Sequence, residues 1–99
     1  MNIIKTQSEG KTIFALSGRL DTTTAPQLQE TLLSELDTVK EVELDFTEMT
    51  YVSSAGLRVL LTGEKTAKSR GVSMTLTHVS PDIMEIFKMT GFETVLHIA

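Results

Sequence analysis

Two adjacent serines, Ser53 and Ser54, stand between an apolar run and the expected start of a helix. A serine hydroxyl at a helix start accepts a hydrogen bond from a free backbone N–H, so either residue suits an N-cap. The same position offers unpaired N–H donors and a partial positive charge, which favour an anion such as a phosphate. The spacing therefore permits both a structural cap and a phosphorylation site.

Enzyme chemistry at this serine pair lacks its usual partners in the sequence. The segment VSSAG has no Gly-x-Ser-x-Gly elbow. A nucleophilic serine also needs a base within hydrogen-bond reach, and the two histidines, His78 and His97, are expected near the ends of other strands. No glycine-rich phosphate loop and no metal-ligand spacing occur. The sequence predicts no catalytic residue, no metal site and no cofactor.

Composition limits the remaining classes of function. The 99 residues suit one domain, spanning residues 1–99. With 13 acidic and 9 basic residues the net charge is −4, which disfavours direct binding of nucleic acid. There is no cysteine and no apolar run near the roughly 20 residues of a membrane span. We expect a cytoplasmic monomer that is not bound to a membrane.

Hydrophobic periodicity predicts the elements that position the serines. Val42, Leu44 and Phe46 alternate with acidic residues, as in a strand with one buried face. Leu28 and Leu32 recur at helical spacing. By such patterns strands are expected at 2–7, 12–17, 40–46, 72–77 and 94–98, and helices at 25–37, at 55–69 and from 81 to Gly91. The order ββαβαβαβ predicts an α/β fold: a mixed sheet with an initial hairpin and parallel β-α-β units packed by helices.

Capping signals mark the predicted helix starts. Thr24 and Gln27 have the spacing of a capping box, and Ser80 precedes Pro81 as an N-cap. Residues 47–53, between a strand and the second helix, are expected to form a loop.

Three segments of the chain resemble the STAS-domain anti-sigma factor antagonists of bacteria. They are LSGRLDTTTAPQL (16–28), ELDFTEMTYVSSAGLRVLL (43–61) and FKMTGFETVLHI (87–98). The segments occur in the order and at the spacing of that family, and the likeness covers essentially the whole chain. The resemblance implies a STAS fold and a protein–protein switch, not an enzyme.

The resemblance also implies a mechanism. The unphosphorylated antagonist binds an anti-sigma factor and displaces the sigma factor, which regulates sigma-factor-dependent transcription. The anti-sigma factor is a serine kinase that phosphorylates the antagonist, and a serine phosphatase reverses the modification. The acceptor corresponds to Ser54. Ser53 stands where the family often has aspartate, so Ser53 stays an alternative acceptor.

The resemblance further implies a set of partner contacts. The residues concerned are Asp21, Thr22, Thr23, Ser53, Ser54, Gly56 and Arg58. A side chain at Gly56 would crowd the helix start. Arg58 departs from the small residue that the family often has at this position: its cation could pair with a phosphate or with an acidic group of a partner, or it is an exposed helix residue without a special role. The alternative is a STAS scaffold without phosphorylation, in a signalling or lipid-transport complex, where the serine pair is only a cap.

Overall fold

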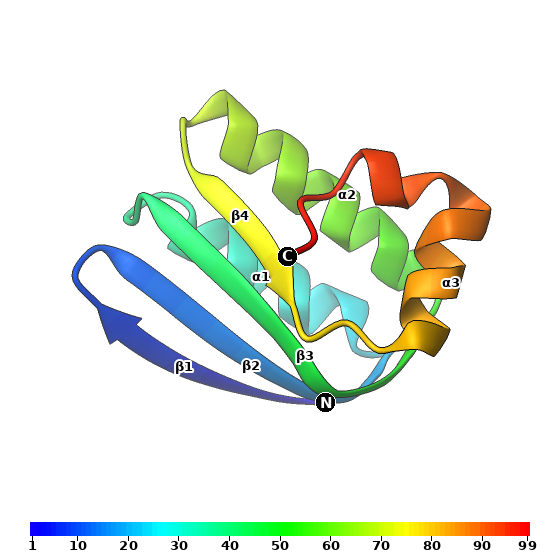
Figure 1. Cartoon of the computed structure of the whole chain (residues 1–99). Helices are drawn as coiled ribbons and strands as arrows, with labels where there is room; N and C mark the ends of the chain where they lie inside the picture. Colours follow the sequence, from blue (N-terminus) through cyan, green and yellow to red (C-terminus); the bar gives the residue numbers. More distant parts are fainter.

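A four-stranded sheet forms the frame of the molecule, and its strands run in the order β1-β2-β3-β4 (Figure 1). The computed structural model describes all residues 1–99. β1 (Asn2–Ser8) pairs antiparallel with β2 (Lys11–Leu20), whereas β3 (Glu41–Val52) and β4 (Ser73–Thr77) are added in parallel. This confirms the predicted hairpin followed by parallel β-α-β units.

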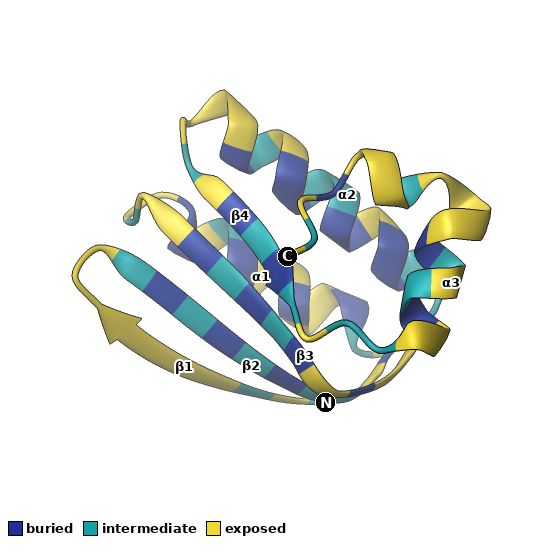
Figure 2. Cartoon of the chain, viewed as in Figure 1, coloured by how far each residue is buried: buried dark blue, intermediate teal, exposed yellow.

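Helices cover one face of this sheet. α1 (Ala25–Glu35) and α2 (Ser54–Ser69) lie side by side behind the strands, and α3 (Pro81–Thr90) lies at one end (Figure 1). Phe87 of α3 packs on Phe46 of β3, with ring centroids 6.4 Å apart. The face of the sheet turned to the viewer carries no helix (Figure 2). None of the helices combines the length and apolar composition needed to cross a bilayer.

The core lies between the sheet and the helices and follows the alternation of the strands. Val42, Leu44 and Phe46 of β3 are fully buried, while the residues between them are less buried (Figure 2). Leu32 of α1 packs toward α2 at Gly63, where an added Cβ would lie 2.6 Å from the Cδ2 atom of Leu32. Glycine at this position therefore lets α1 and α2 approach closely.

β3 is longer than the sequence pattern predicts. The alternation at 40–46 predicts a strand followed by a loop at 47–53, but β3 continues to Val52. The added part pairs with the end of β2, which itself continues past Gly18 to Leu20. Shifts in the register between the two strands interrupt the period of two, so the residue pattern did not mark this part as strand.

The predicted last strand at residues 94–98 is wrong as a complete strand. Phe92–Thr94 form a short 3-10 helix, η1, which uses part of the predicted strand. Only Ile98 makes a β-bridge, in parallel with Leu76 of β4. The N–H of Leu76 donates to the carbonyl of His97 at 2.8 Å, so the segment still covers the outer edge of β4.

Glu35 ends α1, earlier than the predicted residue 37, and lies in a buried polar cluster. Its carboxylate accepts from the Thr12 hydroxyl, from Gln7 Nε2 at 3.1 Å and from Lys5 Nζ at 2.9 Å. Burial raises the pKa of Glu35, but the hydrogen bonds and the lysine charge outweigh it and hold the pKa below its ordinary value. The cluster fastens α1 to the start of β2.

Candidate functional site

The carboxyl ends of β2 and β3 bring the predicted site residues to one edge of the sheet (Figure 1). Leu20 pairs with Val52 across these strands, and the N–H of Ser53 donates to the carbonyl of Leu20 at 2.9 Å. The loop of residues 21–24 and the start of α2 are therefore neighbours. In open α/β sheets, binding sites form at this edge.

Ser53 is the N-cap of α2. Its backbone is extended, with φ −91° and ψ 175°, and its Oγ accepts a hydrogen bond from the N–H of Gly56 at 3.2 Å. This bond satisfies one of the N–H groups that a helix start leaves unpaired. The structure therefore assigns the cap to Ser53 and leaves the neighbouring hydroxyl free of that role.

Ser54 is the first residue of α2 and is exposed to solvent. Because the preceding serine makes the cap, the hydroxyl of Ser54 is not needed to close the first turn. An exposed hydroxyl at a positive helix start is accessible to a modifying enzyme and tolerates an added anion.

Gly56 fits tightly against the end of β2. A Cβ at this position would lie 2.7 Å from the Cγ atom of Leu20 and 3.0 Å from its carbonyl oxygen. The second neighbour is backbone, which cannot move aside as the end of a flexible side chain can. The close contact explains physically why the helix start uses glycine here.

The side chain of Asp21 closes the turn that leads into α1, and Thr24, at the N-cap position, makes no side-chain cap bond. Its Oδ1 accepts from the N–H of Thr23 at 3.0 Å and of Thr24 at 3.1 Å. The Thr24 hydroxyl donates instead to the carbonyl of Arg19 at 2.8 Å, so the predicted capping box of Thr24 and Gln27 is wrong. The Thr24 N–H, more than the other donors, holds the pKa of Asp21 below its ordinary value, against the opposing effect of burial.

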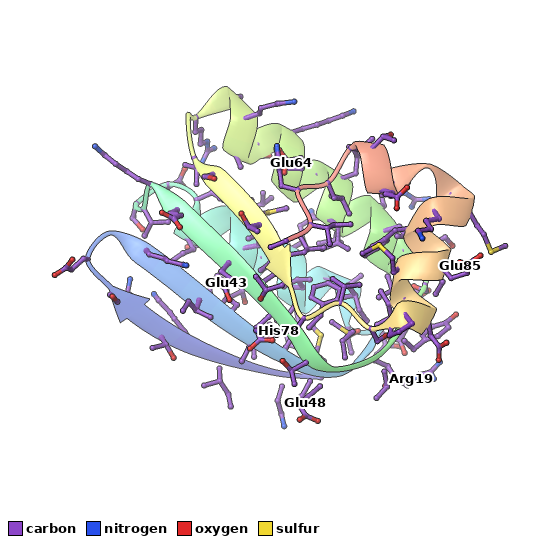
Figure 3. The ribbon with its side chains drawn as sticks, in the orientation of Figure 1. Arg19, Glu43, Glu48, Glu64, His78 and Glu85 are labelled. Carbon is purple, nitrogen blue, oxygen red and sulfur yellow. The ribbon has the colours of Figure 1, made fainter.

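Arg19 and Tyr51 form a stacked pair that the sequence does not predict. The guanidinium carbon of Arg19 lies 4.2 Å from the centroid of the Tyr51 ring, which is a cation–π contact. Arg19 Nε also lies 3.6 Å from Oδ2 of Asp21. Arg19 belongs to the last part of β2, and Figure 3 shows it at the end of the sheet opposite the β1–β2 turn. The pair depends on the part of β3 that was expected to be a loop, which is why the sequence did not indicate it.

A groove of about 240 Å³ lies between the starts of α1 and α2. It is lined by Thr22, Ala25, Pro26, Gln29, Ala55, Arg58 and Val59. The structure thus brings together Thr22 and Arg58 of the predicted contact residues, while Thr23 is exposed and lies outside the lining. Arg58 is the one charged residue of the groove.

Each histidine faces a carboxylate. Nδ1 of His78 lies 3.1 Å from Oδ1 of Asp45, and Nδ1 of His97 lies 3.2 Å from Oε1 of Glu64 (Figure 3 labels His78 and Glu64). Neither histidine forms a hydrogen bond with the serine pair. Both histidines are paired instead with carboxylates of other elements.

Comparison of sequences finds relatives whose similarity extends along nearly the whole chain. The family model described as "Mlab, STAS domain" matches residues 4–97. BtrV of Bordetella bronchiseptica, named as a candidate anti-sigma factor antagonist, is 30% identical over 100% of this chain and 86% of its own. The anti-sigma-B factor antagonist of Listeria monocytogenes is 31% identical over 84% of this chain and 74% of its own.

Solved structures share the fold. The anti-sigma factor antagonist SpoIIAA in its unphosphorylated form matches with a TM-score of 0.83 and 16% identity, over 99% of this chain and 88% of that one. The phosphorylated form of SpoIIAA from Bacillus matches with a TM-score of 0.77 and 16% identity, over 99% and 91%. These matches confirm the predicted α/β fold class.

Proposed function

Because the chain belongs to the STAS-domain family of anti-sigma factor antagonists, we propose that it binds an anti-sigma factor that is also a serine kinase. Phosphorylation of Ser54 ends this binding, and a serine phosphatase restores it. The unphosphorylated chain thereby frees a sigma factor and regulates the transcription that depends on that sigma factor. The chain acts as a cytoplasmic monomer through protein contacts alone.

The division of roles between the two serines carries this proposal. Ser53 is engaged with Gly56 as the helix cap, whereas Ser54 is exposed one residue further on. A kinase that reads this edge therefore finds one free hydroxyl in a defined backbone conformation. The same argument makes Ser53 the weaker acceptor, since its hydroxyl is engaged with the Gly56 N–H and a kinase would have to draw it away from the helix start.

The proposed step is phosphoryl transfer from ATP bound to the partner. The Oγ of Ser54 forms a bond to the γ-phosphorus while the bond from that phosphorus to the leaving ADP oxygen breaks. The serine proton leaves to a base of the kinase or to water. The chain itself supplies only the acceptor and its positioning.

Phosphorylation would change the surface rather than the fold. The phosphate adds roughly −1.5 to −2 charges at neutral pH, and it sits at the positive end of a helix, where an anion is tolerated. SpoIIAA, which shares the fold, has been solved in both forms. Loss of partner binding would follow from charge and bulk at the docking edge.

Phosphorylation of matched variants by a purified candidate kinase with ATP tests the acceptor. The wild type should gain the mass of one phosphate, Ser54→Ala should gain none, and Ser53→Ala should still be modified. Modification that persists in Ser54→Ala and disappears in Ser53→Ala would assign the site to Ser53. A chain that binds its partners without ever being modified would favour the scaffold function.

A further inference from the structure

Arg58 is the unpaired cation beside the proposed acceptor. It is exposed, lines the groove between α1 and α2, and forms no ion pair within the chain. The other two arginines do form ion pairs, Arg19 with Asp21 and Arg70 with Asp37. The guanidinium of Arg58 is therefore available to an anion from outside or to one added nearby.

Ser54 and Arg58 lie four residues apart within α2. Residues at this spacing are neighbours on one face of a helix, with Cβ atoms about 5–6 Å apart. The arginine fork binds phosphate or carboxylate oxygens in a bidentate manner, and its side chain is long enough to turn either toward the helix start or into the groove. One guanidinium can thus serve two anions, but only one at a time.

We propose that the binding partner of Arg58 depends on whether Ser54 is phosphorylated. Arg58 binds a carboxylate of the partner protein when the serine is unmodified, and it binds the phosphate when the serine is phosphorylated. The inference rests on the proposed function and adds the residue that couples the modification to docking. Phosphorylation then acts twice, since it adds an anion and also removes the cation that the partner uses.

The groove indicates which partner group Arg58 would meet. Ala25 and Val59 are buried and Ala55 is half-buried, so the lining suits a small apolar side chain next to the charged contact. The chain as a whole carries a charge of −4, so most of its surface repels a carboxylate of a partner. The cation of Arg58 is a place where a partner's carboxylate is favoured over a basic group. The occupant that fits is a partner segment with one carboxylate beside a small apolar residue.

Titration of the phosphate tests half of this proposal without any partner. Phosphoserine is incorporated at position 54 during translation, and the ³¹P signal is followed against pH. A neighbouring cation stabilises the dianion, so the second pKa of the phosphate should be higher in Arg58→Gln than in the wild type. Lys65→Gln, which removes an exposed charge from the same helix, is the matched control and should titrate like the wild type.

Equal titration of the wild type and Arg58→Gln would overturn the intramolecular contact. The titration needs no kinase, so it tests the contact between Arg58 and the phosphate even if no anti-sigma factor binds the chain. Failure to bind any anti-sigma factor would contradict the proposed function but not this contact.

Partner affinity tests the other half, with the kinase that modifies the wild type as the probe. Arg58→Gln and Arg58→Glu should weaken binding by at least about tenfold, as expected for a charged hydrogen-bonded contact, and Lys65→Gln should not. Phosphorylation and Arg58→Gln should together weaken binding by less than the product of their separate effects, because both remove the same contact. Unchanged or tighter binding of Arg58→Glu would show that the partner presents no carboxylate there.

Discussion

The hydroxyl of Ser53 accepts a hydrogen bond from the N–H of Gly56 at 3.2 Å and caps the first turn of α2, whose first backbone bond runs from the N–H of Leu57 to the Ser53 carbonyl at 2.9 Å. It separates the two serines, since one becomes part of the helix and the other remains on its surface. The separation has consequences for stability that can be measured without a partner.

Ser53→Ala should lower the free energy of unfolding by about 1 kcal/mol, because the N–H of Gly56 loses its acceptor. Ser53→Asp should be close to the wild type, since aspartate is also a good N-cap and favours a helix start. Ser54→Ala is the matched control and should stay within about 0.5 kcal/mol. Urea unfolding measures all three, and equal losses for both alanine variants would contradict the assignment of the cap.

Gly56→Ala should destabilise the chain more than Gly63→Ala. The added methyl group at Gly56 meets the backbone oxygen of Leu20 at 3.0 Å, whereas at Gly63 the close neighbour is the end of the Leu32 side chain. We expect a loss of about 1–3 kcal/mol at Gly56, after allowing for the better helix propensity of alanine. Thermal or urea unfolding compares the two variants, and a smaller loss at Gly56 would mean that Leu20 moves aside.

The start of α2 illustrates how far the sequence alone could predict this site. Local signals were sufficient where one residue determines a helix end: Ser80 caps α3 by accepting from Ile83 at 3.3 Å, and Gly91 follows its last turn with φ 80°. They also placed two serines at the start of α2. They could not decide which one caps, because either has the necessary hydroxyl.

What the sequence did not predict depends on contacts between distant residues. The stacking of Arg19 on Tyr51 depends on the exact register of β2 against β3. The two shifts in this register mean that a residue pattern with a period of two cannot predict which side chains become neighbours. The turn closed by Asp21 takes the place of the plausible box at Thr24, and only the path of the chain after β2 decides between the two. The groove beside Arg58 exists because α1 and α2 pack together.

Acid should remove the stabilising contribution of Glu35. Its folded-state pKa lies below the ordinary value of 4.5, so the contribution is complete above that pH and is lost as the pH falls through the folded-state pKa. Near neutral pH, Glu35→Gln should lower the free energy of unfolding by about 1–3 kcal/mol, because Thr12 and Lys5 lose a charged acceptor. Urea titrations should show the gap between wild type and variant shrinking from about pH 5 to pH 3.

Glu30→Gln, an exposed change on the same helix, is the control for this titration and should follow the wild type. Comparing variants rather than absolute stabilities matters, because the pKa values of Asp21, Glu43 and Asp45 are also held below their ordinary values and contribute their own acid sensitivity. A gap that stays constant down to about pH 3 would show that the Glu35 carboxylate is not stabilised by folding.

The affinity of the anti-sigma factor kinase for two forms of the chain tests the central claim most directly. One form carries serine at position 54 and the other carries phosphoserine, and calorimetry measures both at the same ionic strength. The account predicts a complex with the serine form and an affinity lower by at least about tenfold for the phosphoserine form. Equal affinity of the two forms would contradict the switch.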